Sequence, residues 1–172
     1  KYGISYLIQA FALVLNRHKT APLRLLLVGG GIKEREYKQL AIDLGIAEHV
    51  VFQGLVPFSE VPDWHNELDI YVSPSILDSE SFGVSAVEAM ACERPVIVTD
   101  VGGLPEVVLK GKTGLIIPPR NAEAIANAIL FLIENPELAA EMGRQGRLHA
   151  KATYEWRDNV QTMLDIYKSL KA

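Results

Sequence analysis

The sequence predicts an α/β fold, a doubly wound parallel sheet with helices on both faces. Short apolar runs rich in β-branched residues alternate with amphipathic helical segments along the chain, which is typical of buried parallel strands joined by crossover helices. Glycines end the first two apolar runs, at Gly29 and Gly54. The 172 residues suffice for one hydrophobic core, so we predict a single domain over residues 1–172.

Five segments are predicted as strands, and helices are predicted between and after them. The strands are expected at residues 23–28, 50–53, 70–72, 95–99 and 113–117, and the helices at about 1–15, 33–44, 59–68, 83–91, 104–108, 121–132, from 136, and 156–170. Ser59 and Asn121 are expected to be helix N-caps, because their side-chain oxygens can accept from free backbone N–H groups. The histidines at 18, 49, 65 and 149 lack metal-ligand spacing and are expected at the surface. We expect Trp64, Tyr154 and Trp156 to be packing residues.

The chain opens on a helix with no strand before it, which matters for the order of the sheet. A full doubly wound sheet of the order 3-2-1-4-5-6 would have its first strand at the centre. We expect that strand to be lacking, with an abnormal junction between residues 25–28 and 70–72. Closing this junction would give the other common doubly wound order, 2-1-3-4-5. Leaving it open exposes two unpaired parallel edges, and such edges favour self-association.

Composition excludes several functional classes. The net charge of −4 argues against nucleic acid as a partner, because phosphate binding needs a basic surface. Cys92 is the single cysteine, so we expect no disulfide framework and no cysteine-based metal site. No apolar run reaches membrane-spanning length, and we expect no signal peptide. The single cysteine favours a reducing, cytoplasmic compartment.

The segment from Glu80 to Glu88 is the most informative part of the sequence. It holds two carboxylates around the start of a predicted helix, just beyond the strand at 70–72. In helical register Val84, Val87, Glu88 and Ala91 share one face, so we expect Glu88 to point inward, where a carboxylate needs hydrogen-bond donors. A sugar nucleotide fits this layout, because its hydroxyls can meet carboxylates and its phosphates can meet a helix N-terminus. The alternative is an ion pair of Glu88 with an arginine or lysine, with Glu80 solvated.

Two glycine-rich turns are further candidates for ligand contact. Residues 29–31 supply half of a dinucleotide fingerprint, but Glu34 stands where its last glycine belongs, so a nicotinamide or flavin cofactor is not expected. Gly102 and Gly103 follow another strand. They could contact phosphate or sugar through backbone N–H groups, or they could form a structural turn, and the sequence leaves both interpretations open.

Taken together, the motifs resemble a known family. The sequence is similar to the carboxyl-terminal domain of family 4 retaining glycosyltransferases over nearly its whole length. The matching motifs are LVGGG (residues 27–31), FQG (52–54), YVSPS (71–75), ESFG (80–83), EAMA (88–91), PVIVTD (95–100), GGLPE (102–106) and TGL (113–115). Each motif is weak alone, but their order makes the resemblance specific.

The resemblance implies a Rossmann-like domain of a two-domain GT-B enzyme. This half would bind a nucleoside-diphosphate sugar, and the acceptor would be held by an amino-terminal domain missing from this sequence. Glu80, the catalytic candidate, would contact hydroxyls of the donor sugar. The backbone at Phe82, Gly83 and Val84 would meet the sugar and diphosphate, and Glu88 would hold the ribose hydroxyls.

The resemblance also places residues outside this segment. Val56 would lie near the nucleobase, and Lys1 near the diphosphate. Family members transfer sugars with retention and generally need no metal or other cofactor. They act in polysaccharide or glycolipid synthesis, so peripheral association with the inner face of the membrane is an open alternative. Glu93 stands where the family often has a glycine that ends a helix, which implies a left-handed residue under strain of roughly 1 kcal/mol.

Two other functions remain open at this stage. The chain could be a nucleotide-binding or regulatory module without catalytic activity, or part of a sugar-nucleotide epimerase of the same architecture. The sequence does not reveal the nucleobase, the sugar or the acceptor.

Overall fold

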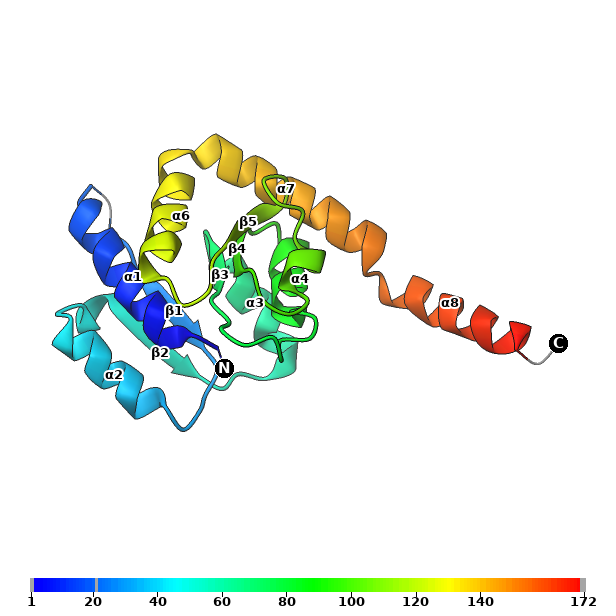
Figure 1. Ribbon diagram of the computed structural model, residues 1–172, viewed down its shortest axis with the longest axis horizontal. Helices are drawn as coiled ribbons and strands as arrows, with labels where there is room; N and C mark the ends of the chain where they lie inside the picture. The colour runs from blue at the N-terminus through cyan, green and yellow to red at the C-terminus, as the bar shows by residue number, and fades with distance from the viewer. Residues whose placement is uncertain (1, 21, 171–172) are drawn as a thin grey trace.

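A computed structural model describes residues 2–20 and 22–170 (Figure 1). The α/β class is confirmed, because strands and helices alternate close to their predicted positions. The elements are α1 (Ile4–Arg17), β1 (Leu25–Val28), α2 (Glu34–Asp43), η1 (Ala47–His49), β2 (Val50–Gly54), η2 (Phe58–Glu60), α3 (Val61–Asn66), β3 (Tyr71–Ser73), α4 (Val84–Ala91), β4 (Val96–Thr99), α5 (Leu104–Val107), β5 (Gly114–Ile117), α6 (Ala122–Glu134), α7 (Pro136–Thr153) and α8 (Trp156–Ser169).

The strands form two separate parallel sheets. β1 pairs with β2, and β3, β4 and β5 form a three-stranded sheet in that order. Within the described residues no ladder joins β1 to β3. The expected abnormal junction is therefore confirmed, and each sheet has an unpaired edge where a continuous sheet would have a neighbouring strand.

Helices, rather than hydrogen bonds between strands, hold the two sheets together. α1 and α6 lie side by side (Figure 1), and one hydrophobic cluster joins Val14 of α1 and Ile125 of α6 to the buried Ile97 of β4. Leu27 of β1 and Val72 of β3 pack against the same cluster. The cluster thus bridges both sheets.

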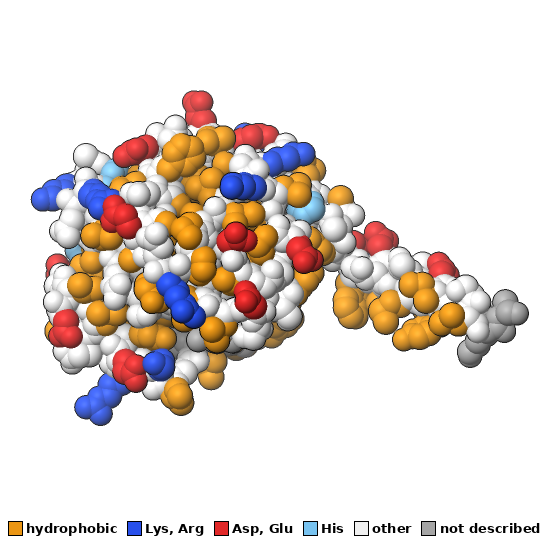
Figure 2. Space-filling view, viewed as in Figure 1, with side chains coloured by type: hydrophobic (Ala, Val, Ile, Leu, Met, Phe, Trp, Pro, Cys, Tyr) orange, Lys and Arg blue, Asp and Glu red, His pale blue; other side chains and the backbone are white. Residues whose placement is uncertain are grey.

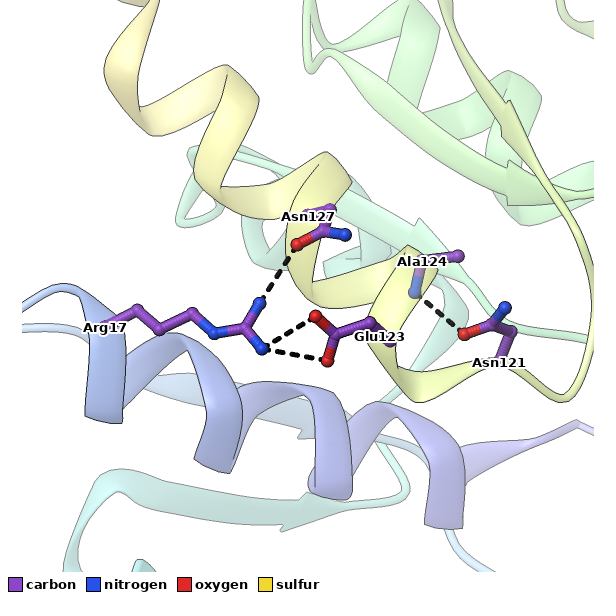
Figure 3. Close-up of polar contacts among 5 residues, drawn as sticks. All are labelled: Arg17, Asn121, Glu123, Ala124 and Asn127. Atoms are coloured by element: carbon purple, nitrogen blue, oxygen red, sulfur yellow. Dashed lines mark hydrogen bonds and ion pairs between the residues drawn. The ribbon is translucent and has the colours of Figure 1, made fainter.

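Polar contacts fix the α1–α6 pair at its edge. In Figure 3, the Arg17 guanidinium donates to both carboxylate oxygens of Glu123, at 2.7 and 2.9 Å, and to Asn127 Oδ1 at 3.0 Å. Asn121 Oδ1 accepts from the Ala124 N–H at 2.9 Å, which confirms the predicted N-cap. The ion pair is exposed, so the apolar contacts contribute most of the stability.

On the other side of the three-stranded sheet, α4 packs closely on α7. Glu93, just past α4, has a φ of 61°, which confirms the left-handed residue expected there. A Cβ at Gly143 of α7 would collide with the backbone oxygen of Glu93, and one at Gly146 would press on Met90. The small residues of α7 therefore set how close α4 lies.

Two local predictions were wrong. Ser59 does not cap α3, because it lies inside η2, and the N-cap position is occupied by Glu60 without a side-chain hydrogen bond. Trp156 does not pack in the core, because it is 75% exposed. A proline at the start of α3 removes one of the backbone N–H groups that a side-chain cap would satisfy.

Trp156 belongs to α8, which projects away from the rest of the chain (Figure 1). Its apolar residues gather along one edge in Figure 2 and include Met163, Leu164, Ile166 and Tyr167, all exposed. The rest of the described chain therefore does not cover this apolar edge. None of the helices within the described ranges has the length and apolar character to cross a bilayer.

The contact between α4 and α7 yields a stability prediction. Gly143→Ala should lower the free energy of unfolding, because the added methyl group would clash with the backbone carbonyl of Glu93, which cannot rotate away as a side chain could. Overpacking typically costs about 1–3 kcal/mol, and the better helix propensity of alanine offsets at most about 1 kcal/mol. The measurement is urea unfolding, with Gly31→Ala as the control because a Cβ there has open space. A Gly143→Ala variant as stable as the control would contradict this account of the packing.

The unpaired edges yield a second prediction. The isolated 172-residue chain should self-associate as its concentration rises, because β1 and β3 each carry free hydrogen-bonding groups on one edge. Sedimentation velocity over a range of concentrations checks this. A single monomeric species throughout would show that these edges do not drive association.

Candidate functional site

The carboxyl ends of β1, β2 and β3 open into a cleft of about 1050 Å³. Its lining runs from the glycine turn after β1 to the loop after β3 and the start of α4. Part of the volume lies between the two sheets, because Leu27 of β1 and Val72 of β3 also line it. Ligands of open α/β sheets bind at this edge, where the strand order changes direction.

Glu80 lies in the loop between β3 and α4 and reaches the cleft. Its side chain is half-buried, and the hydroxyl of the buried Ser75 donates to its Oε2 at 3.3 Å. The backbone is also held, because the Gly103 N–H donates to the Glu80 carbonyl oxygen at 2.9 Å. The side chain is thus held by a hydroxyl of its own loop, and the main chain by the turn that follows β4.

The turn at Gly102 and Gly103 supports this loop. A Cβ at Gly102 would collide with the carbonyl oxygen of Glu80, and one at Gly103 with that of Ser81. Gly102 also has a φ of 54°, which favours glycine. Of the two interpretations left open by the sequence, the geometry favours a structural turn, one that brings two loops into backbone contact.

The helix N-terminus lies at the edge of the cleft. Gly83 has a φ of 83° and is the N-cap of α4, which begins at Val84. Both Val84 and Ser85 line the cleft, and the first N–H groups of a helix have no partner within it. The first turn itself carries no acidic residue, which suits an anion at the helix start, and the carboxylates of Glu80 and Glu88 lie elsewhere in the same lining.

Glu88 reaches the same cleft, although the predicted buried face of α4 was wrong. The face that packs inward consists of Ala86, Ala89 and Met90, whereas Val84 is 59% exposed. Glu88 lies beside that face, with its side chain 30% exposed, and lines the cleft. It therefore points toward a possible ligand position rather than into the core.

The partner of Glu88 is a histidine that the sequence did not single out. His65 of α3 is 7% exposed, and its Nε2 lies 3.7 Å from Glu88 Oε2. The expectation of a surface histidine was therefore wrong at this position. Burial lowers the pKa of His65, and the nearby Glu88 carboxylate acts in the opposite direction with a smaller effect. The spacing between α3 and α4 in the sequence gave no signal for this contact.

A second polar contact ties the start of α4 to the sheet. The Tyr71 hydroxyl donates to Ser85 Oγ at 2.7 Å, and the Tyr71 ring meets the His65 ring edge-on, with centroids 5.5 Å apart. Burial raises the pKa of Tyr71, so its phenol remains a neutral donor at ordinary pH.

The other predicted site residues differ in burial and in position relative to the cleft. Val56 is half-buried and lines the cleft, as does Trp64. Phe82 is 41% exposed, and its ring meets that of Tyr154 edge-on at 5.3 Å, which confirms Tyr154 as a packing residue. Lys1 lies outside the described residues, so its predicted role stays a prediction.

Across the described ranges, no group of three or more histidine, cysteine or acidic side chains has a geometry that could hold a metal ion. The prediction that no metal or cofactor is needed is not tested by this finding and stays a prediction.

The fold and the cleft together define a class of protein. Two parallel sheets, a helix N-terminus free of acidic residues and two carboxylates on one cleft are the features of a nucleotide-binding α/β domain. The comparison with known proteins narrows this class. The sequence profile described as "Glycosyl transferases group 1" matches residues 1–149. The chain therefore belongs to the group 1 glycosyltransferase family.

Two curated relatives illustrate the similarity. A GDP-mannose-dependent α-(1-6)-phosphatidylinositol monomannoside mannosyltransferase from Mycolicibacterium smegmatis is 38% identical over 82% of this chain and 38% of its own length. A D-inositol 3-phosphate glycosyltransferase from Gordonia bronchialis is 37% identical over 94% of this chain and 36% of its own length. The chain thus spans well under half of these relatives.

Solved structures agree. Sucrose-phosphate synthase from Thermosynechococcus elongatus superposes with a TM-score of 0.87 at 32% identity, over 98% of this chain and 42% of that one. The HepE protein of Anabaena, crystallised with UDP, superposes with a TM-score of 0.86 at 26% identity, over 98% of this chain and 45% of that one. The predicted resemblance and fold, those of a GT-B carboxyl-terminal domain, are confirmed.

The buried histidine yields a pH prediction. Because the pKa of His65 is lowered on folding, the unfolded chain binds the proton more readily, and stability should fall as pH drops through the ordinary histidine range, about pH 6.5. Above that range the neutral ring carries no such cost. Unfolding free energies at several pH values check this. His65→Gln should flatten the dependence between neutral and mildly acid pH, and an unchanged slope would contradict it.

Proposed function

We propose that this chain is the donor-binding domain of a retaining glycosyltransferase. Its substrate would be a nucleoside-diphosphate hexose, and the domain would span residues 1–172. The observation that carries the proposal is that Glu80, Glu88 and the N-terminus of α4 line one cleft. Membership of the group 1 family supports the same activity.

Each part of the donor has a matching group. Ribose hydroxyls would donate to the half-buried carboxylate of Glu88. The diphosphate would meet the first N–H groups of α4, where Gly83, Val84 and Ser85 line the cleft. Hydroxyls of the sugar would donate to Glu80, whose side chain accepts from Ser75 and whose main chain accepts from the Gly103 N–H. Val56 would lie against the nucleobase, and Lys1 near the diphosphate.

The donor requirements are otherwise open. One relative is named as GDP-mannose-dependent, and HepE was crystallised with UDP and with UDP-glucose. These names support a nucleotide hexose as substrate and do not select the base. We propose that transfer proceeds with retention and without a bound metal, with backbone N–H groups and a basic side chain stabilising the diphosphate.

The acceptor substrate would be bound by a second domain. Transfer needs the acceptor held against the donor with water excluded, and the cleft described here has a wall from this domain only. We propose that an amino-terminal domain supplies the other wall and covers the exposed apolar edge of α8. The isolated chain should then be inactive. For the complete protein we propose a cytoplasmic location, with peripheral membrane contact if the acceptor is a lipid.

Separate substitutions of the two carboxylates test the division of roles. Glu88→Ala should weaken binding of both a nucleoside diphosphate and its sugar derivative by about 1–3 kcal/mol, the range for hydrogen bonds to a charged group. Glu80→Ala should weaken binding of the sugar nucleotide alone. Calorimetric titration with UDP, GDP and their glucose and mannose derivatives measures both effects.

The matched control is Glu134→Ala, an exposed carboxylate at the end of α6, which should bind like the wild type. Equal losses for Glu80→Ala on the bare nucleotide and on the sugar nucleotide would sink the assignment of Glu80 to the sugar.

Activity of the protein that carries this chain separates the proposed function from its alternatives. A labelled donor with an acceptor extract should give a product whose anomeric configuration, read by NMR, matches that of the donor. A new sugar nucleotide formed without acceptor would indicate an epimerase instead. Nucleotide binding without any turnover would indicate a regulatory module.

A further inference from the structure

His65 lies directly beneath the cleft and has no role in the proposed donor contacts. It comes from the short helix α3, is 7% exposed, and lines the cleft next to Glu88. Its Nε2 is 3.7 Å from Glu88 Oε2. Its Nδ1 is buried, with no hydrogen-bond partner among residues 2–20 and 22–170.

The surroundings of these two nitrogens determine which of them carries the proton of the neutral His65 ring. A proton on Nδ1 would be a buried donor without an acceptor, which is costly. A proton on Nε2 faces a carboxylate oxygen instead. The ring can carry one proton and remain neutral, so the environment selects the neutral form with its N–H on Nε2.

The same geometry limits how Glu88 can be oriented. Within the described residues, no lysine or arginine forms an ion pair with Glu88, and the recorded charge partner is His65. The separation of 3.7 Å is outside the range of a direct hydrogen bond, so in the structure the attraction is electrostatic. A direct hydrogen bond between the two groups requires a closer approach of Oε2 to Nε2 than the structure shows.

Packing around the ring favours a fixed position for it. Tyr71 meets the ring edge-on and is itself tied to Ser85 at the start of α4. Leu68 lies just past α3, and its carbonyl oxygen accepts from the Arg94 guanidinium at 2.8 Å. This hydrogen bond links the end of α3 to the segment that follows α4. These contacts hold the imidazole in a fixed position next to Glu88.

We propose that His65 is a positioning residue for the nucleotide: its Nε2–H holds one oxygen of Glu88 and leaves the other free for ribose hydroxyls. This inference rests on the proposed function, in which Glu88 binds the ribose. It predicts that His65 affects discrimination between ribose and deoxyribose, since its influence passes through the carboxylate that reads the hydroxyls.

The test compares UDP and GDP with their 2′-deoxy and 3′-deoxy counterparts, titrated into the protein that carries this chain. The wild type should prefer the ribonucleotide by about tenfold, the effect of one hydrogen bond to a charged group. His65→Phe keeps an aromatic ring without a donor, and this preference should fall to roughly twofold or less. His65→Gln retains an N–H donor and should recover most of the preference.

The outcomes separate the two proposals. A wild type that binds ribo- and deoxynucleotides equally would refute the ribose role of Glu88, and with it the proposed function. A wild type that discriminates, with His65→Phe weakening both ligands by the same factor, would show that His65 only supports the fold and would overturn its positioning role.

A measurement on the wild type covers the case in which His65→Phe does not fold. Nitrogen-15 NMR of the histidine side chains at pH 7.5 should show His65 neutral with its proton on Nε2, and UDP or GDP should shift this signal more than the deoxy forms. A proton on Nδ1, or an unchanged signal at saturating ribonucleotide, would overturn the inference.

Discussion

The contact between the Glu80 loop and the turn at Gly102 and Gly103 is the constraint on which the rest of the site depends. The two loops follow neighbouring strands, β3 and β4, and meet backbone to backbone. Their approach is so close that a Cβ at either glycine would collide with a carbonyl oxygen of the Glu80 loop. A contact of this kind leaves little freedom in the main chain, so the backbone of Glu80 is positioned by the turn that follows β4. The start of α4 follows within a few residues and is fixed with it.

The two carboxylates are held in different ways, and this difference fits their proposed roles. Glu80 accepts from a buried hydroxyl, whereas Glu88 lies on a regular helix beside a buried imidazole. α4 is held at its start by the hydrogen bond from Tyr71 and packs closely against the glycines of α7. Fixed acceptors of this kind reduce the entropy lost when a flexible sugar nucleotide binds.

Much of the fold could be predicted from the sequence, because the signals were local. Apolar runs ended by glycine marked the strands, and Asn121 marked a helix start. The left-handed residue at Glu93 was expected from the family resemblance rather than from a local signal. The failures came from tertiary contacts. Helical periodicity placed Val84 on the buried face of α4, but the close packing of α7 selected the alanine face instead.

The candidate site was predicted in part for the same reason. The spacing of Glu80 and Glu88 around a predicted helix start indicated a ligand site, and both residues line the cleft. The sequence could not show that α3 brings His65 next to Glu88, or that Ser75 supports Glu80, because neither contact has a periodic signature. It also could not decide the role of Gly102, since a phosphate-binding turn and a structural turn need the same residue.

The central claim is that one donor molecule spans Glu88 and Glu80, with its diphosphate at the start of α4. A crystal structure of the protein that carries this chain, with an intact nucleoside-diphosphate sugar bound, tests it most directly. The account predicts ribose hydroxyls within hydrogen-bond distance of the Glu88 carboxylate, phosphate oxygens at the N–H groups of Val84 and Ser85, and sugar hydroxyls at Glu80. A donor bound elsewhere in the cleft, or one whose ribose lies away from Glu88, would contradict it.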